Sequence, residues 1–577
     1  MKKALFKAIE KAVIIFLVAI PLLPVFSQKS IEFFFRLPEG KVYRLRDLKN
    51  AHPDSVKILD LSYAKISTLP PEILKFKNIE AIILRKNPAL KVKQVLRELA
   101  QLPKLWYLDL SWNRFTSLPD EVGLLTNLKV LKLNDNKAIN HISDAICNVP
   151  LEAIHLKRTY MLDVENVFST LSNCDGLLAI DLSFNQLFSI PANVKDLHSL
   201  EFLALNNNLI TKLPPTLSDL PNLKWLNLRG NVWINAEQVF DALANSKSLE
   251  TLIVSECDIK ELPDNIGNLK PLKYLDLRSN NMVKVSGGLC ELKNLEVLLL
   301  GYINFGERMN YLEKIPSCIR NLRKLRKLDL RGNKLEALPA SVKKLTNMEH
   351  LDVSLNELTR FPAGISSMKK ISYLNLGGNK FSQFPTAICR LTNLDTLIFD
   401  GFYFHPAKFK VKSLPSCIGN LEQLKVLSLN DQVIRNLPPS ITNLSNLEEL
   451  WVRNNLLKHL PEDIHELGNL RLMNLKANEL EDLPETMPQL ASLRILDISY
   501  NLPLDLQKVL PILIQMKQLE LLDISYNPTI TDELVKQLEE ALPNTEVIAI
   551  PIDDYLRVPP PSWLQEKIMK KYQKIKR

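Results

Sequence analysis

Histidine and the acidic residues are the first place to look for catalysis or metal binding in this 577-residue chain. The eight histidines stand at no spacing that suits a metal site. The sequence holds no P-loop, HExxH, GxSxG or kinase pattern. Asp463 and His465 lie close together, but we interpret them as solvated residues on the outside of the fold. The sequence therefore predicts no catalytic residue, no metal site and no cofactor.

The seven cysteines stand singly along the chain, without a CxxC pair. An odd number of cysteines cannot pair completely within one chain. Their spacing lacks the density of a disulfide framework, and a free cysteine behaves as a small hydrophobic residue. We therefore expect buried thiols rather than disulfide bonds at Cys147, Cys174, Cys257, Cys290, Cys318, Cys389 and Cys417.

Aromatic and arginine residues are the usual energetic anchors of protein interfaces, and here they recur at positions expected to face solvent from one side of a sheet. The residues expected to bind a protein partner in this way are Tyr107, Trp112, Phe184, Phe202, Trp225, Arg229, Tyr274, Arg278, Tyr302, Arg331, Tyr373 and Trp451. Two alternatives stay open. The aromatic residues would stack across strands to stabilise the sheet, and the arginines would form ion pairs with Asp276, Asp329 and Asp352.

Two insertions supply further candidates for partner binding. NFGERMNY begins at residue 304 and contains Phe305, and YFHPAKFKVK begins at 403 with Tyr403 and Phe404. Both follow a predicted strand on the same edge, four strands apart, which corresponds to a separation of roughly 20 Å. One partner would be able to bridge them, whereas the alternative is that block duplication left two loops without a role.

A repeated segment must position all these residues. LWYLDLSWNRFTSLP begins at residue 105 and returns as LEFLALNNNLITKLP from 200, LRKLDLRGNKLEALP from 325 and LEELWVRNNLLKHLP from 447. The frame recurs in about 20 units, at intervals of 23, 26 or 30 residues. Alternating apolar residues such as Leu108 and Leu110 predict a short strand in each unit.

The remainder of each unit predicts a turn and an outer segment. An asparagine, such as Asn113 or Asn208, stands three residues after the last leucine of the strand in most units. Its amide must enter the core and bond to backbone groups of neighbouring turns. Proline then ends the strand, and the 26-residue units carry helical patterns such as VKQVLRELAQL from 92 and AEQVFDALANS from 236.

This pattern resembles the leucine-rich repeat family over roughly residues 54 to 550. It is similar to the Ras-group and bacterial surface type, LxxLxLxxNxLxxLPxxIxxLxxL, with some ribonuclease-inhibitor-like helical units. The resemblance implies an α/β fold, a right-handed solenoid or horseshoe of about 20 repeats. A parallel β-sheet would line its concave face and irregular or helical segments its convex face. It also implies a protein partner at the concave face and no catalytic residues.

Composition excludes several classes of protein. With 46% hydrophobic residues the chain can bury a large core, so it is not disordered. Only 16 residues are glycine, which leaves little material for glycine-rich nucleotide-binding loops. Most of the net charge of +9 lies in residues 1–27 and 566–577, so the body of the chain is nearly neutral. We therefore expect no nucleic-acid partner.

The chain is expected to contain four segments. Residues 1–27 resemble a signal peptide, with early lysines, an apolar run from Ala12 to Phe26 and a cleavage site after Ser27. Residues 28–53 would form an N-terminal cap, residues 54–550 the solenoid, and residues 551–577 a tail with a short basic helix. The alternatives are an uncleaved signal anchor in the membrane and a tail that contacts an anionic membrane surface.

We therefore predict an exported bacterial scaffold without enzymatic activity, located in the periplasm, at the cell surface or outside the cell. It would recognise a protein partner through its concave face and the two inserted loops. An intracellular Ras-group-like signalling scaffold is the alternative, and it would be favoured if residues 1–27 were retained in a cytosolic protein.

Overall fold

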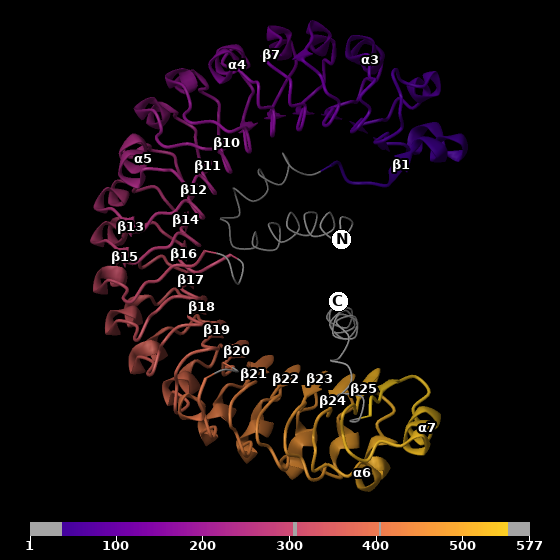
Figure 1. Cartoon of the computed structure of the whole chain (residues 1–577), viewed down its shortest axis with the longest axis vertical. Helices are drawn as coiled ribbons and strands as arrows, with labels where there is room; N and C mark the ends of the chain where they lie inside the picture. The colour runs from indigo at the N-terminus through magenta and orange to yellow at the C-terminus, as the bar shows by residue number, and fades with distance from the viewer. Residues whose placement is uncertain (1–36, 304–307, 403–404, 552–577) are drawn as a thin grey trace. The chain divides into compact units, whose positions relative to one another are not determined.

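The computed structural model describes residues 37–303, 308–402 and 405–551 (Figure 1). The chain divides into two compact units, and the boundary lies between Asn310 and Tyr311. We call the part before this boundary unit 1 and the part after it unit 2. The predicted signal peptide and nearly all of the predicted C-terminal tail lie outside the described residues.

Unit 1 is built on a parallel sheet of three-residue strands. Their order in the sheet follows the chain: β1 (Val42–Arg44), β2 (Ile58–Asp60), β3 (Ala81–Ile83), β4 (Tyr107–Asp109), β6 (Val130–Lys132), β8 (Ala153–His155), β9 (Ala179–Asp181), β10 (Phe202–Ala204), β11 (Trp225–Asn227), β12 (Thr251–Ile253), β14 (Tyr274–Asp276) and β16 (Val297–Leu299). Each strand pairs in register with the equivalent residues of the next, as Leu203 does with Leu226.

Unit 2 repeats the same construction. Its strands also pair in chain order: β17 (Lys327–Asp329), β18 (His350–Asp352), β19 (Tyr373–Asn375), β20 (Thr396–Ile398), β21 (Val426–Ser428), β22 (Glu449–Trp451), β23 (Leu472–Asn474), β24 (Ile495–Asp497), β25 (Leu521–Asp523) and β26 (Glu546–Ile548). In both units the parallel strands confirm the predicted α/β solenoid.

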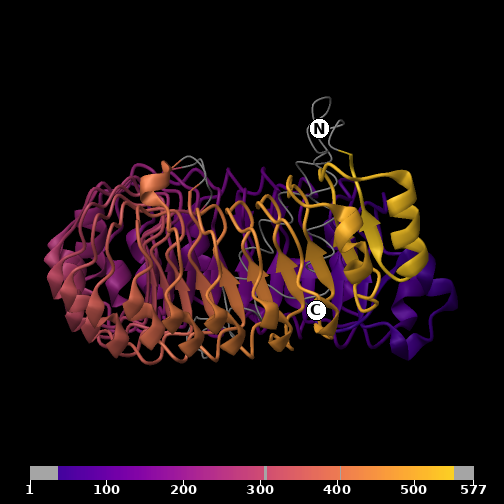
Figure 2. The same cartoon turned by 90° about the horizontal axis from the view of Figure 1, so that it is seen from below.

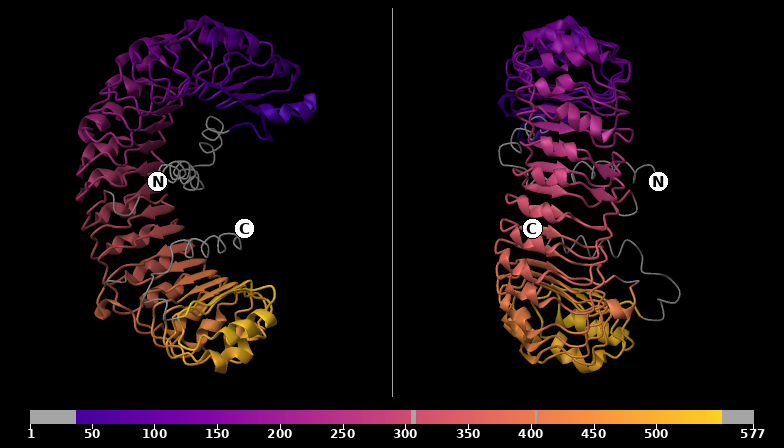
Figure 3. Two further views of the ribbon diagram at one scale, coloured as in Figure 1. Left: turned by 45° about the vertical axis from the view of Figure 1, so that its right-hand side comes forward. Right: turned by 90° about the vertical axis from the view of Figure 1, so that its left-hand side faces the viewer.

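Helical segments cover the other side of each sheet, as Figures 1 and 3 show. The α-helices occur where the predicted helical patterns stand and in three further coils: α3 (Val92–Leu99), α4 (Val164–Leu171) and α5 (Ala236–Leu243) in unit 1, and α6 (Leu506–Leu513) and α7 (Asp532–Ala541) in unit 2. Most shorter coils have a 3-10 turn instead, as in Ala192–Asp196 after Pro191. Short two-residue strands, β5 (Ser117–Leu118), β7 (His141–Ile142), β13 (Glu261–Leu262) and β15 (Lys284–Val285), pair elsewhere in the coils of unit 1.

In most coils an asparagine side chain joins neighbouring coils through hydrogen bonds in the core, as predicted. Asn113 Nδ2 donates to the carbonyl oxygens of Leu84 at 3.0 Å and Leu110 at 2.8 Å, and its Oδ1 accepts from the Asn87 backbone at 2.6 Å. Asn113 is 1% exposed, so these bonds satisfy a buried amide that would otherwise be costly. Because each side chain reaches the preceding coil, the ladder fixes the stacking of coils in both units.

The expectation of buried thiols is wrong for six of the seven cysteines. Cys147 bonds to Cys174 and Cys389 to Cys417, and Cys290 and Cys318 are also in a disulfide-bonded state. Partners in the first two bonds are 27 and 28 residues apart, close to the length of one coil. Stacking therefore brings the paired cysteines together, with Cα atoms 4.5 and 5.6 Å apart. Only Cys257 is a free thiol, and it is buried at the position where other coils have asparagine.

Candidate functional site

The face of each sheet opposite the helical segments, here called the inner face, carries the first and third side chains of every strand. The middle residue points into the core, as does Leu108 between Tyr107 and Asp109. Because equivalent residues of neighbouring strands pair with each other, the inner-face side chains form columns that run across the strands of each unit. Figure 2 shows the strands of unit 2 side by side, with their directions parallel. These columns are the places where a partner could contact the sheet.

In unit 1 the inner face holds a continuous cluster of apolar side chains, here called the apolar strip. Its members are Ile58, Ala81, Ile83, Tyr107, Val130, Ala153, Ala179, Phe202, Ala204, Trp225, Ile253, Tyr274, Val297 and Leu299, with Leu37, Trp106 and Leu178 packed against it. The neighbouring strands lie about 4.8 Å apart, so side chains of one column contact each other directly.

The expectation that the aromatic residues of these strands face solvent is wrong for four of them. Tyr107, Phe202, Trp225 and Tyr274 lie on the predicted face, but they are only 1%, 5%, 8% and 7% exposed. They pack into the apolar strip instead. Burial raises the pKa of the Tyr107 hydroxyl, and the nearby Asp109 carboxylate raises it further.

Charged groups lie within the same face. Arg85 Nε is 2.6 Å from Asp109 Oδ2, and His155 Nδ1 is 3.5 Å from Asp181 Oδ2. Burial lowers the pKa of Lys132 to about 8, although the Asp109 carboxylate opposes this shift. Burial would raise the pKa of Asp181, but hydrogen bonds and the charge of His155 outweigh it, so the pKa is lowered. The polar groups of this face are thus paired with one another.

Ion pairs flank the apolar strip on the side where the strands begin. They join the residues that immediately precede adjacent strands, with nitrogen–oxygen distances of 3.1 Å for Lys57–Glu80, 2.6 Å for Lys129–Glu152, 2.7 Å for Lys224–Glu201 and 2.7 Å for Lys273–Glu250. Because the lysines are partly exposed, each pair contributes little to stability. Their arrangement gives the strip a charged rim.

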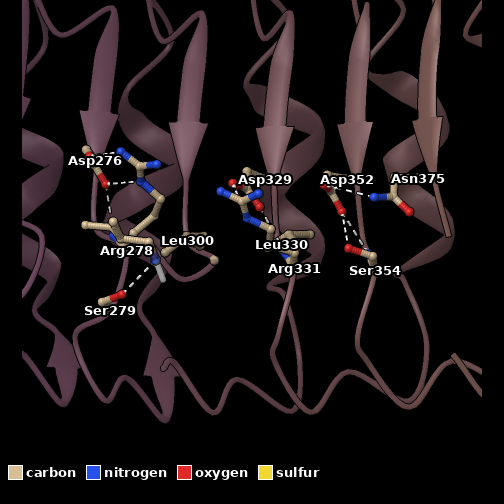
Figure 4. A network of polar contacts seen from close by, with 12 residues as sticks. Asp276, Arg278, Ser279, Leu300, Asp329, Leu330, Arg331, Asp352, Ser354 and Asn375 are labelled. Carbon is tan, nitrogen blue, oxygen red and sulfur yellow. Dashed lines mark hydrogen bonds and ion pairs between the residues drawn. The ribbon is translucent and has the colours of Figure 1, made fainter. Parts of the chain in front are cut away.

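The predicted arginines lie on the side where the strands end, and each is half-buried beside a carboxylate. Arg229 forms two hydrogen bonds with Glu256, at 2.8 and 2.9 Å, and Arg278 forms two with Asp276, at 2.7 and 3.0 Å. In unit 2, Arg331 Nε is 3.2 Å from Asp329 (Figure 4). The ion-pair alternative considered from sequence therefore describes Arg278 and Arg331.

In unit 2 the inner face is more polar. Tyr373 is half-buried and stacks on His350, with ring centroids 4.0 Å apart. Burial, with the charges of Lys327 and Arg331, lowers the pKa of His350 to about 3. Trp451 is half-buried, donates from Nε1 to Glu449 at 3.0 Å, and packs against a cluster of Leu472, Ile495 and Leu521.

The remaining predicted residues are not gathered on the inner face. Trp112, 39% exposed, and the half-buried Phe184 lie in the turns that follow β4 and β9. Tyr302 is half-buried in the turn after β16. Phe305, Tyr403 and Phe404 lie outside the described residues.

Sequence reasoning missed several exposed apolar side chains in the turns after the strands of unit 1. Tyr63 is 63% exposed, Met161 68%, Phe188 69% and Trp233 68%. The sequence already indicated the exposure of Tyr63, because Tyr63, Trp112 and Phe184 each stand two residues after the last leucine of their strand. A comparison of this one position across coils would therefore have found Tyr63.

Within the described ranges, no three histidine, cysteine, aspartate or glutamate side chains are grouped so that they could hold a metal ion. No helix of that part of the chain is both long and apolar enough to cross a membrane.

Comparisons with known proteins agree with this architecture. Family models match residues 298–405 and 408–550 as a "leucine-rich repeat region", and residues 175–232 and 104–125 as leucine-rich repeats. No curated protein matches the chain by sequence.

Solved structures also resemble it. A leucine-rich repeat protein of Leptospira interrogans is 25% identical with a TM-score of 0.50, over 88% of this chain and all of that one. TLR13, solved in complex with ssRNA13, is 21% identical with a TM-score of 0.54, over 89% of this chain and 83% of that one.

Proposed function

Because the chain belongs to the leucine-rich repeat family, whose fold is typical of protein-binding domains, we propose that it is a scaffold that binds a protein partner through its inner face. The proposal includes no enzymatic activity. It also includes export from a bacterial cell and contacts from the two inserted loops.

The apolar strip of unit 1 is the observation that carries this proposal. It gathers fourteen apolar side chains on the sheet face opposite the helical segments, with lysine–glutamate pairs along one side and Arg229 and Arg278 along the other. An apolar centre within a polar rim is the usual anatomy of a protein interface. Arginine, tyrosine and tryptophan are the residue types most often found at energetic hot spots, and the half-buried Arg229 and Arg278 of unit 1 and Tyr373 and Trp451 of unit 2 are of these types.

Preorganisation supports the same function. The asparagine ladder and the parallel register fix the inner-face side chains before any partner arrives. Binding to such a surface costs little ordering of backbone or side chains, so more of the contact energy appears as affinity.

The disulfide bonds support export. Disulfides persist in oxidising compartments and are rare in the bacterial cytosol. Six cysteines of the chain are disulfide-bonded, and the bonds Cys147–Cys174 and Cys389–Cys417 each join neighbouring coils. The resemblance to a Leptospira protein supports a bacterial source.

Site-specific photocrosslinking in native cells tests the inner face. A photoreactive phenylalanine replaces Arg229 beside the inner face, or Tyr373 or Trp451 on it, and Lys344, exposed in an outer 3-10 turn, serves as the matched control. We expect a defined crosslinked protein from the inner positions and none from position 344. Equal crosslinking from both faces, or none from the inner face, would remove the proposal.

Fractionation of the same cells tests export. A chain that begins at Gln28 in the envelope or medium supports the proposal. A soluble cytosolic chain with an intact Met1 and reduced cysteines would instead favour an intracellular signalling scaffold.

A further inference from the structure

Unit 1 carries a second row of side chains, at the edge of the sheet where the strands end. In successive coils, the residue before the asparagine position has a positive φ angle: Tyr63 at 60°, Lys86 at 56°, Trp112 at 63°, Asp135 at 60°, Arg158 at 55°, Phe184 at 61° and Asn207 at 55°. We call these seven residues the left-handed row. The row is distinct from the inner face, because none of its members belongs to a strand.

Backbone hydrogen bonds make the row continuous from coil to coil. The amide of Tyr63 donates to the carbonyl of Arg85, that of Lys86 to Ser111, and that of Trp112 to Asn134, at 2.9, 3.2 and 2.8 Å. The same pattern continues through Asp135, Arg158 and Phe184. Neighbouring members of the row therefore lie one strand spacing apart, about 4.8 Å.

Cations and aromatic rings contact each other along the row. Lys86 Nζ lies 4.7 Å from the ring centres of both Tyr63 and Trp112, and it donates to the Tyr63 hydroxyl at 2.6 Å. Farther along, Arg158 lies 4.8 Å from the Phe184 ring, and Lys157 lies 4.5 Å from it. These contacts hold the rings and the positive charges at the surface, and Tyr63 remains 63% exposed.

The backbone conformation of the row disfavours the side chains that it carries. A left-handed φ costs a residue with a Cβ atom conformational energy that glycine avoids. At the same position the later coils of unit 1 have Gly230, Glu256 and Ser279, and unit 2 has Gly332, Leu355, Gly378, Asp431, Asn454 and Ala477, before Tyr500 and Tyr526 at its end. The turn therefore accepts glycine and small residues, and the fold does not require aromatic or basic ones there.

The surroundings of the row are apolar and basic. Tyr160, Met161, Phe188 and Trp233 are exposed in the turns that follow β8, β9 and β11. Exposed basic side chains in the neighbouring turns include Lys65, Arg114, Lys137 and Lys212. The acidic member of the row, Asp135, is buried and lies 3.5 Å from Arg158. An exposed apolar surface with excess positive charge is an interaction surface for an acidic partner.

We propose that the left-handed row of unit 1 is a second docking surface, which binds an acidic segment of a protein through Tyr63, Lys86, Trp112, Arg158 and Phe184. The carboxylates of that segment would approach Lys86 and Arg158, and its apolar side chains would cover Tyr63, Trp112 and Phe184. This proposal goes beyond the inner-face function and does not depend on it.

A polypeptide fits the row better than a nucleic acid does. A phosphate backbone presents regularly spaced charges and is bound by a track of cations. Here the buried Asp135, 3.5 Å from Arg158, interrupts the row, so the cations do not form a regularly spaced track. The exposed Met161 and Phe188 also match the side chains of a mixed acidic and apolar peptide.

Substitution by glycine tests the row without disturbing the fold, because glycine accepts a left-handed φ. The test variant combines Tyr63→Gly, Lys86→Gly and Trp112→Gly in the full chain. The matched control combines Leu355→Gly, Asp431→Gly and Asn454→Gly at the same frame position of unit 2.

Circular dichroism should give melting temperatures no lower than that of the unmodified chain. If the triple variant does not fold, the single variant Lys86→Glu replaces it, because it reverses the charge at the centre of the row.

The probe is a random peptide library displayed on phage and selected on the full chain, with the triple variant used for counter-selection. We expect the recovered peptides to combine Asp or Glu with aromatic or aliphatic residues. They should bind the unmodified chain and the control at least about tenfold more tightly than the variant, and more weakly as NaCl rises from about 50 to 300 mM.

Three outcomes would overturn the proposal. Recovered peptides would lack acidic residues, they would bind the triple variant with unchanged affinity, or the selection would yield no binder that distinguishes the two proteins. A separate titration with poly(U) RNA tests the other class of partner. Salt-sensitive RNA binding that the glycine variant loses would assign the row to nucleic acid instead.

Discussion

The inner faces of the two units differ although their backbones repeat the same coil. In unit 1 the first residues of most strands are apolar, including Tyr107, Phe202 and Trp225, and they bury one another. In unit 2 the corresponding residues begin with Lys327, His350 and Tyr373 and include Glu449. The difference shows that the leucines and asparagines specify the coil, whereas the inner-face residues vary freely and decide what the surface can bind.

Exchange of inner-face residues between the units should give the largest effect. Trp225→Glu places a carboxylate in the apolar strip of unit 1, where position 225 is 8% exposed, and should lower the free energy of unfolding by about 4 kcal/mol. Glu449→Trp makes the opposite exchange on the half-buried face of unit 2 and should cost about 1 kcal/mol or less. Hydrogen exchange at β10–β12 and at β21–β23 measures the two effects. Equal costs would mean that the faces do not differ as described.

Disulfide removal should have an intermediate effect that is similar in the two units. Replacing both Cys147 and Cys174 with serine, or both Cys389 and Cys417, opens a loop of 27 or 28 residues. Each pair should lower the free energy of unfolding by about 3 kcal/mol, because the unfolded chain gains entropy. Urea denaturation of each variant, with Cys257→Ser as the control for a free thiol, provides the measurement. A large loss in only one unit would show that the units differ in their cores as well as in their faces.

The smallest effect concerns pH, and its direction should be opposite in the two units. In unit 2, burial and the neighbouring Asp523 raise the pKa of Asp497 to about 7. The folded state therefore binds a proton that the unfolded state releases, so unit 2 should gain stability as pH falls from about 7 to 4. In unit 1, burial lowers the pKa of Lys132 to about 8, so the unfolded state holds the proton more tightly. Unit 1 should gain stability as pH rises from about 8 to 10.

Within its range, each gain should be about 1 kcal/mol for every pH unit crossed. Hydrogen exchange at β24 and β6 across this pH range separates the two responses. Because burial also raises the pKa of Asp523, replacing both Asp497 and Asp523 with asparagine should abolish the acidic response alone, and Lys132→Met the alkaline response alone. A response that survives its own substitution would assign it to another group.

The fold was predictable because its determinants are local. Leu108, Leu110 and Asn113 lie within six residues and specify a strand, a core contact and a turn without reference to distant sequence. The helix at Val92–Leu99 follows from its own apolar periodicity.

The details of the candidate site were less predictable because they depend on contacts between coils. Trp225 is buried by residues of neighbouring coils, and Phe202, its nearest neighbour in the column, stands 23 residues earlier in the chain. Cys147 finds its partner only after one full coil. The left-handed row appears when one frame position is compared across coils, and the pattern within a single coil gives no sign of it.

The disulfides also give the solenoid a particular mechanical behaviour. A chain pulled from its two ends would release its coils in steps, since each coil is held mainly by its immediate neighbours. A coil closed by Cys147–Cys174 cannot extend, so roughly 95 Å of contour length stays hidden until that bond is reduced. The chain would therefore be shorter at full extension under oxidising conditions than under reducing ones, and its bonded coils would act as rigid markers along the stretched molecule.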